Sequence, residues 1–200
     1  PQSMPVLVFI HGGDYLQGGT ADSELHGCNL VRATSNAVVV TIQYRLGVFG
    51  FLGDYRLAAR EGGSAATTST GNYGLLDQIA ALRWVKNNVG VFGGNSGKIM
   101  IFGESAGAGS VNNLLVSPLA RGLFHRAVMQ SGAFALWTTK RMSDAVDVFD
   151  DLLDKSGCAD SDNDDAIGCL VGMPAEALVK TAETLTSYPD QWDACRWAPT

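Results

Sequence analysis

A serine between glycines stands where an apolar run meets a stretch of small residues. Residues 99–109 read Ile-Met-Ile-Phe-Gly-Glu-Ser-Ala-Gly-Ala-Gly, with Ser105 in a Gly-x-Ser-x-Gly pattern. A serine on a sharp strand-to-helix turn exposes its hydroxyl above a sheet as a nucleophile, and glycines fit where the turn brings backbones close together. The N–H of Ala106 then lies at a helix N-terminus, which favours developing negative charge. The pattern predicts Ser105 as a nucleophile and Ala106 as an oxyanion donor; the alternative is a structural glycine-rich turn.

A second glycine pair follows an earlier apolar run. Residues 6–10 are apolar and β-branched, as in a strand buried on both faces of a parallel sheet, and His11-Gly12-Gly13-Asp14 comes directly after them. An acyl-transferring serine needs N–H donors from such a loop as well as from the residue after the nucleophile. Because carboxyl ends of parallel strands share one edge of a sheet, we predict that the N–H groups of Gly13 and Asp14 complete the oxyanion hole. The alternative is that the glycines only allow a turn.

Apolar runs alternate with amphipathic stretches along the first 130 residues, and this alternation predicts a parallel α/β sheet. The predicted strands are residues 6–10, 37–42, 98–102 and 126–130. The predicted helices between them follow residues 75–89 and 105–116. An irregular glycine-rich turn is expected at residues 43–53, and an exposed loop at 62–71.

From Ser143 onward only helical patterns are predicted. Ser143 is expected to cap a helix that ends just before Gly157, and Pro174 to begin another helix. We therefore expect one partial α/β domain across residues 1–200, with residues 138–200 as a helical excursion within it rather than a second domain.

The composition excludes several classes of protein. Hydrophobic residues make up 46% of the 200 residues, which indicates a soluble globular domain. The net charge is -6 and no cluster of lysine and arginine is longer than two residues, so nucleic acid and anionic membranes are not expected partners. No apolar run approaches the roughly 18 residues that a transmembrane helix needs.

Six short segments occur in order along the chain: Phe9-Ile10-His11-Gly12-Gly13, Tyr44-Arg45-Leu46-Gly47, Gly71-Asn72-Tyr73-Gly74-Leu75-Leu76-Asp77-Gln78, Phe92-Gly93-Gly94, Gly103-Glu104-Ser105-Ala106-Gly107 and Gln130-Ser131-Gly132. Together they resemble the type-B carboxylesterase family, which includes cholinesterases and fungal lipases. The resemblance runs across the whole chain. It implies an α/β-hydrolase fold, a Ser-Glu/Asp-His triad and hydrolysis of small-molecule or lipid carboxylic esters without a cofactor.

The resemblance also bears on individual residues. It implies the nucleophile and the three oxyanion donors named above. Glu104 matches a glutamate that lies beside the nucleophile in cholinesterases, and Trp137 is expected either to line an acyl pocket or to be an ordinary core residue. Asp14 stands where the commonest family pattern has a third glycine. A carboxylate at this position either points away from the developing negative charge or reduces or alters the activity.

The histidine that a nucleophilic serine needs does not occur in a suitable place. In this fold the order along the chain is nucleophile, acid, histidine, and the only histidine after Ser105 is His125, with no Asp or Glu between them. His125 precedes the last predicted strand, about 16 Å from its carboxyl end. His11 belongs to the oxyanion loop, and His26 to a loop without an assigned position. The triad acid and histidine are therefore expected beyond Thr200, and residues 1–200 alone are expected to be inactive.

Two of the four cysteines, Cys158 and Cys169, stand eleven residues apart. Their place downstream of the nucleophile resembles that of a disulfide in secreted members of the family, which implies an oxidising compartment and a secreted protein. Two buried thiols are the alternative. Cys28 and Cys195 have no assigned partner. The acidic run at 160–165 lacks the glycine and glutamate of a calcium loop, so no metal is predicted.

Three functional hypotheses remain. The first is a secreted serine esterase or lipase that forms an acyl-enzyme at Ser105. The second is a cholinesterase-like adhesion or scaffold domain without the chemistry, although such relatives often lack the nucleophile that this chain retains. The third is an inactive truncated fragment, in which half a sheet leaves an open edge and uncovered apolar faces.

Overall fold

The fold is known from a computed structural model, which describes residues 3–22, 25, 27–34, 36–64, 67–133, 135–159, 163–185 and 196–200. Within these residues, four strands form one parallel sheet in the order β2-β1-β3-β4. The strands are β1 (Met4–Ile10), β2 (Val38–Ile42), β3 (Gly94–Glu104) and β4 (Arg126–Gln130). Each overlaps one of the predicted strands, so the predicted parallel α/β sheet is confirmed.

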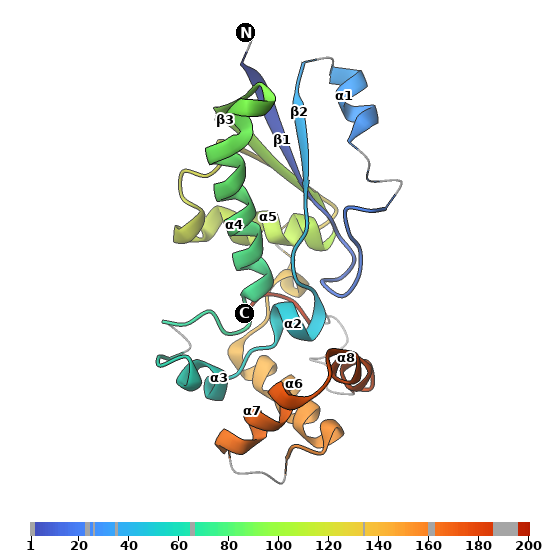
Figure 1. The fold of residues 1–200 in the computed structure, drawn as a ribbon, viewed down its shortest axis with the longest axis vertical. Helices are drawn as coiled ribbons and strands as arrows, with labels where there is room; N and C mark the ends of the chain where they lie inside the picture. The colour runs from blue at the N-terminus through green and yellow to red at the C-terminus, as the bar shows by residue number, and fades with distance from the viewer. Residues whose placement is uncertain are drawn as a thin grey trace.

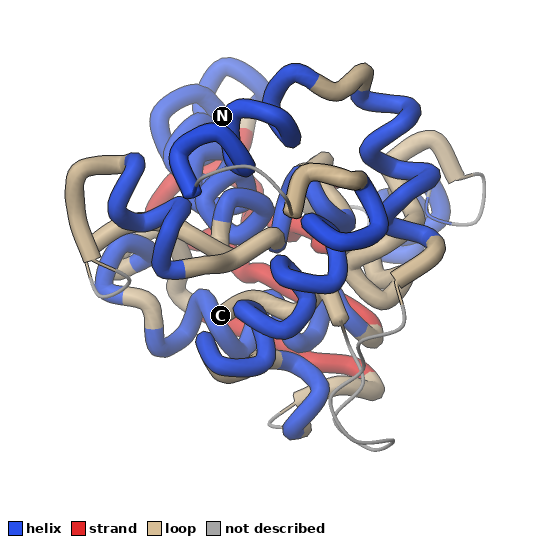
Figure 2. The backbone as a smooth tube through the Cα atoms, turned by 90° about the horizontal axis from the view of Figure 1, so that it is seen from below, coloured by secondary structure: helices blue, strands red, loops and turns tan. Residues whose placement is uncertain are grey.

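Helices surround the strands, as the view from below shows (Figure 2). They are α1 (Cys28–Thr34), α2 (Gly47–Phe51), α3 (Tyr55–Arg60), α4 (Tyr73–Asn88), α5 (Ala106–Val116), α6 (Met142–Ser156), α7 (Asn163–Gly172) and α8 (Ala175–Glu183). Short 3₁₀ turns occur at η2 (Val89–Phe92), η3 (Pro118–Ala120) and η4 (Leu136–Thr138). The sheet occupies one end of the molecule with α1, α4 and α5, whereas α3, α6, α7 and α8 gather at the other (Figure 1).

One face of the sheet, packed against α4 and α5, carries the main core. Alternate residues of the two central strands are fully buried there: Val6, Val8, Ile10, Ile99 and Ile101. The two helices are joined inside the core, where the Gln78 side-chain amide donates to Ser110 Oγ at 2.9 Å. Alternation of buried residues along each strand therefore positions α5, the helix that follows Ser105.

The opposite face of the sheet is less completely covered. Leu7, Phe9 and Phe102 alternate with the buried residues and are half-buried. The rings of Phe9 and Phe102 lie 5.0 Å apart, and both line a pocket with Leu30 of α1. Because a helix as short as α1 does not cover this face, the prediction that β1 is buried on both faces is wrong for the part of the chain that the structure describes.

The segment predicted as an irregular turn, residues 43–53, contains helix α2. Backbone packing is tight there, since a Cβ on Gly50 would lie 2.1 Å from the carbonyl oxygen of Arg45. Arg45 pairs with Asp77 of α4: its Nε and backbone N–H donate to one carboxylate oxygen at 2.8 and 2.9 Å, and Nη2 donates to the other at 2.9 Å. This hydrogen bonding raises the pKa of Arg45. Two of the six resemblance segments are thereby joined.

The expected disulfide is confirmed. Cys158, just after α6, is bonded to Cys169 in α7. The bond therefore holds two helices of the excursion together. Cys28 is an exposed free cysteine, and Cys195 lies outside the described residues.

Helix α6 ends as expected but begins differently. Gly157, with a φ of 74°, is its left-handed C-cap. The predicted cap at Ser143 is wrong, because α6 already begins at Met142. The Asp144 carboxylate accepts the backbone N–H of Arg141 at 3.3 Å, and this acidic side chain in the first turn supports the helix N-terminus instead.

Residues 196–200 return from the excursion to the core. Lys140 is buried, and its Nζ donates to the carbonyl oxygens of Phe51 and Arg196 at 2.9 and 2.8 Å. Thr200 and Asn72 exchange two hydrogen bonds, at 2.9 and 3.1 Å. These contacts connect the far end of the excursion to the start of α4. The helical sequence pattern of the excursion does not predict this connection.

We expect the Cys158→Ser, Cys169→Ser double variant to unfold at a lower urea concentration than the parent. The bond joins residues eleven positions apart and so reduces the conformational entropy of the unfolded chain. In the chain-entropy model this adds about 3 kcal/mol to the free energy of unfolding. Equilibrium unfolding in urea measures the difference. Reductant should bring the parent's midpoint to that of the variant and leave the variant's unchanged; equal midpoints without reductant would contradict the prediction.

Candidate active site

The register of β1 and β3 brings two loops to one edge of the sheet. Ile10 pairs with Gly103, so both strands end side by side. A Cβ on Gly12 would lie 2.6 Å from the carbonyl oxygen of Glu104 and 3.2 Å from Cβ of Ser105. The loop after β1 therefore lies directly against the serine, as the sequence predicts.

Ser105 occupies a strained corner between β3 and α5. Its φ of 54° and ψ of -122° lie in a region that non-glycine residues rarely adopt. The backbone N–H of Ser105 donates to the carbonyl oxygen of Gln130 at 2.9 Å, and its own carbonyl accepts the N–H of Gly109 at 3.0 Å. Strand, half-buried serine corner and helix thus follow one another in the order of a nucleophile elbow.

Gly107 makes this corner possible. A Cβ at this position would lie 2.1 Å from the carbonyl oxygen of Ile10 and 2.8 Å from that of His11. Both atoms belong to backbone, so neither can move aside as a side chain would. The first turn of α5 is therefore pressed against the end of β1.

The loop after β1 has an unusual backbone. Gly13, Asp14 and Tyr15 have φ values of 111°, 55° and 58°. Among the described residues, no acceptor takes the N–H of Gly13, and the N–H of Ala106, the first residue of α5, has no partner within its helix. Asp14 is exposed and therefore lies on the solvent side of the loop.

Glu104 and Trp137, the two further residues that the resemblance pointed to, both lie near the corner. Glu104 is exposed, and its Oε2 lies 3.2 Å from where a Cβ of Gly12 would be. A Cβ on Gly132, after β4, would lie 2.5 Å from the carbonyl oxygen of Ser105 and 3.1 Å from Cη2 of Trp137. The structure therefore brings both residues close to the serine backbone.

The histidines have different positions relative to Ser105. The backbone N–H of His125 donates to the carbonyl oxygen of Ile99 at 2.8 Å, and His125 Nδ1 accepts the N–H of Ile99 at 3.2 Å. That pairing is at the amino end of the sheet, away from Ser105 as expected. His11 is buried in the loop after β1, and His26 lies outside the described residues.

Sequence reasoning did not predict the contact between His11 and Tyr44. Their rings are stacked, with centroids 4.5 Å apart, and Tyr44 Oη donates to the carbonyl oxygen of His11 at 2.8 Å. The available signal was that each belongs to one of the six resemblance segments. Their contact shows that the residue after β1 is held by the residue just beyond β2.

A comparison with known families agrees with this geometry. The model of the carboxylesterase family matches residues 1–200. The chain belongs to the carboxylesterase family.

Relatives of this carboxylesterase-family chain share its fold and much of its sequence. It is 41% identical to human cocaine esterase over 188 residues, which are 94% of this chain and 31% of that protein. It is 39% identical to human neuroligin-2 over 180 residues, 90% of this chain and 20% of that protein. The crystal structure of the Geobacillus stearothermophilus carboxylesterase EST55 at pH 6.2 matches it with a TM-score of 0.79 and 42% identity, covering 92% of this chain and 36% of that one. The chain thus spans 20–36% of these relatives' lengths.

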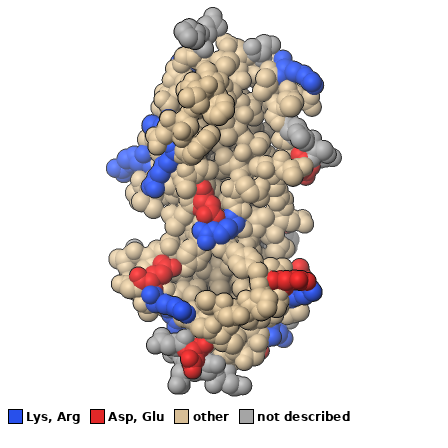
Figure 3. Space-filling view, viewed as in Figure 1, with Lys and Arg blue, Asp and Glu red and all other residues tan. Residues whose placement is uncertain are grey.

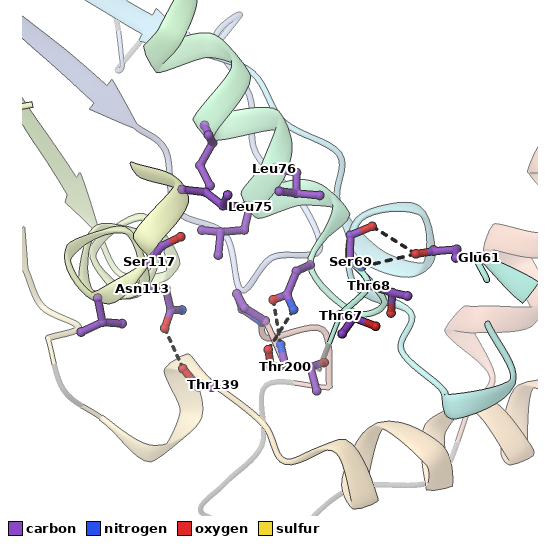
Figure 4. A pocket seen from close by; sticks show the side chains of 15 residues that line it. Glu61, Thr67, Thr68, Ser69, Leu75, Leu76, Asn113, Ser117, Thr139 and Thr200 are labelled. Atoms are coloured by element: carbon purple, nitrogen blue, oxygen red, sulfur yellow. Dashed lines mark hydrogen bonds between the residues drawn. The ribbon is translucent and has the colours of Figure 1, made fainter. Parts of the chain in front are cut away.

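Two large cavities open on the carboxylesterase-family chain. One, of about 660 Å³, lies between α4 and the C-terminal end of α5, with Glu61 and Asn113 at its wall (Figure 4); no predicted site residue lines it. The other, of about 670 Å³, is lined by Leu16, Gln17 and residues of α2 and α8. The N–H groups of Leu16 and Gln17 donate to the carbonyl oxygen of Gly13 at 2.9 and 3.0 Å. The second cavity is therefore lined by two residues that are hydrogen-bonded to the predicted oxyanion loop, although no predicted site residue lines it either.

The charges of the carboxylesterase-family chain are dispersed. On the face seen in Figure 3, Lys and Arg side chains lie beside Asp and Glu side chains, and no broad patch carries one sign. Within the residues described, no group of three or more His, Cys, Asp or Glu is placed to hold a metal ion. Nor does the described part of the chain contain a helix long and apolar enough to cross a bilayer.

We expect Gly107→Ala to destabilise the protein strongly, because the added Cβ meets the Ile10 carbonyl oxygen at 2.1 Å. Overpacking of this kind costs about 1–3 kcal/mol. Gly168→Ala is the matched control: this glycine is also helical, but its Cβ would meet nothing within 4 Å, so a gain of up to about 1 kcal/mol is expected. Thermal unfolding measures both, and equal melting temperatures for the two variants would contradict the prediction.

We also expect His11 to make the stability of the protein depend on pH. Burial lowers the pKa of His11 below its ordinary value of 6.5. As the pH falls through 6.5, His11 becomes protonated in the unfolded state but stays neutral in the folded state, so the free energy of unfolding decreases. Urea unfolding between pH 5 and 8, compared with His11→Asn, measures this contribution. A parent whose stability has the same pH slope as the variant would show that His11 titrates normally.

Proposed function

We propose that the whole protein hydrolyses carboxylic esters through an acyl-enzyme at Ser105. The observation that carries this proposal is the close approach of two loops, in which a strained Ser105 lies against the Gly12–Gly13 backbone. Membership of the carboxylesterase family supports the same reaction class. The N–H groups of Gly13, Asp14 and Ala106 are the proposed oxyanion donors.

The proposed reaction has two halves, acylation and deacylation. Ser105 Oγ attacks the ester carbonyl carbon while a general base takes the hydroxyl proton. The carbonyl oxygen becomes an oxyanion, which accepts hydrogen bonds from the proposed N–H donors. The same base returns the proton to the departing alcohol, which leaves the acyl group on Ser105. Water then attacks the acyl-enzyme by the same route and releases the acid. In this proposal the strained backbone of Ser105 fixes the direction in which its side chain leaves the elbow.

We propose that the base and its carboxylate partner come from residues outside 1–200. His125 is at the amino end of the sheet and His11 is buried in the oxyanion loop. The relatives are considerably longer than this chain. In this proposal residues 1–200 without the rest of the protein are catalytically inactive or nearly so, since losing the base costs several orders of magnitude.

The proposed substrates are esters with an apolar acyl or alcohol group, small molecules or lipids. The cavity next to Leu16 and Gln17 supports this class, because its described lining is mostly apolar and includes Val48, Phe49 and Trp197. An apolar lining favours burial of hydrocarbon over charged groups. The Cys158–Cys169 bond supports a secreted protein, since disulfides persist in oxidising compartments.

A non-catalytic binding domain is the second candidate function. Human neuroligin-2, at 39% identity, is a relative whose name describes no hydrolysis. The retained serine in a strained backbone favours the enzyme, because strain of this kind costs stability and persists where the surroundings enforce it.

We expect a phosphonate ester probe to label the full-length protein covalently at Ser105. Ser105→Ala should abolish labelling without changing the melting temperature. Ser143→Ala, an exposed serine on α6, should be labelled like the parent. Mass spectrometry of the labelled peptide locates the adduct. A folded full-length protein that takes no label would favour the binding domain.

A further inference from the structure

The imidazole of His11 is enclosed at the base of the proposed oxyanion loop. The residue is 1% exposed, and its ring stacks on that of Tyr44 with an interplanar angle of 20°. Gly18 closes the loop over it, since a Cβ on Gly18 would lie 2.8 Å from His11 Nδ1. The ring is therefore enclosed between Tyr44 and Gly18.

The partners of the two ring nitrogens fix the tautomer of His11. Nδ1 lies 2.9 Å from the carbonyl oxygen of Gly12, which only accepts, so Nδ1 carries the proton. Nε2 is buried and has no hydrogen-bond partner among the described residues. A second proton on Nε2 would create a buried charge without an acceptor, which is costly. The environment thus selects the neutral ring with its proton on Nδ1.

The hydrogen bond from His11 acts on the peptide group that carries a proposed oxyanion donor. The carbonyl of Gly12 and the N–H of Gly13 belong to the same peptide unit. A donor at the carbonyl fixes the rotation of that unit and draws electron density away from its N–H, because linked hydrogen bonds polarise one another. The N–H of Gly13 becomes a stronger donor for an oxyanion above Ser105, and it needs no rearrangement to act.

We propose that His11 is a positioning residue for ester hydrolysis, whose Nδ1–H orients and polarises the Gly12–Gly13 peptide so that the Gly13 N–H stabilises the oxyanion. This inference rests on the proposed function. Tyr44 supports it from outside the loop: its hydroxyl holds the His11 carbonyl, and its ring holds the imidazole.

Two substitutions separate the donor from the ring. His11→Asn keeps an N–H donor close to the position of Nδ1 without the ring, whereas His11→Phe keeps a ring to stack on Tyr44 without the donor. Removing an oxyanion donor outright lowers kcat by about 10²–10³, so weakening one through His11→Phe should lower kcat about ten- to a hundredfold. KM should stay within about twofold, because the oxyanion forms only in the transition state. His11→Asn should retain most of the parent's kcat.

The experiment measures kcat and KM of the full-length parent and both variants with a p-nitrophenyl ester. It also measures inhibition by a trifluoromethyl ketone, which forms an oxyanion when it adds to a serine. Affinity for this inhibitor should fall in parallel with kcat in His11→Phe. Val85→Ala in the α4 core is the control for lost stability, and it should leave kcat and inhibition unchanged.

The outcomes distinguish the two proposals. Phosphonate labelling of the parent tests the proposed function alone, and a folded parent without label overturns both proposals. With the parent labelled, unchanged kcat and inhibitor affinity in His11→Phe overturn only the role of His11, as does an equal loss in both variants. Selective ¹⁵N labelling of histidine needs no variant: a proton on Nδ1 of His11 at neutral pH is expected, and a proton on Nε2 overturns the role even if His11→Phe does not fold.

Discussion

The backbones that follow β1 and β3 are in direct contact at the carboxyl ends of these strands, and the geometry of the candidate site is built on this contact. Gly12 lies against the carbonyl of Glu104, and Gly107 lies against that of Ile10. No side chain separates these segments, so their spacing is set by covalent geometry and strand register rather than by rotamers. A hydroxyl and several N–H groups held in this way need little reorganisation to meet a developing charge.

Backbone strain is concentrated at the same edge of the sheet. Among the described residues, the non-glycine residues with positive φ all follow the carboxyl ends of strands: Asp14 and Tyr15 after β1, Ser105 after β3 and Ser131 after β4. Such conformations persist only where the surroundings enforce them. At Ser105 the enforcement is visible, since β4 holds its N–H and α5 holds its carbonyl. The core under α4 and α5 therefore stabilises an edge that is itself locally unfavourable.

The positions of the strands could be predicted because apolar runs of about five residues, too short for a typical helix, alternate with longer amphipathic stretches. The burial of the strands could not be predicted, since it depends on which helices pack on the second face of β1 after folding. Helix α2 was missed because glycines at 47 and 50 indicate a turn, whereas tight packing on Arg45 allows a helix there. Ser143 was predicted to cap α6, but the helix begins at Met142 and the Asp144 carboxylate accepts the N–H of Arg141. The local sequence does not show which of two adjacent polar residues will stabilise a helix N-terminus.

The order of strand, glycine loop and serine elbow could be derived from the amino-acid sequence alone, since these features depend on residue types a few positions apart. The position of His125 at the amino end of its strand, away from the carboxyl edge that carries Ser105, could also be derived, because the direction of a parallel strand follows from its place in the chain. The hydrogen bond from His11 to the Gly12 carbonyl and its stacking on Tyr44, 33 residues away, are known only from the folded chain. A tautomer and a ring contact depend on which atoms surround a side chain after folding, and no local pattern contains that information.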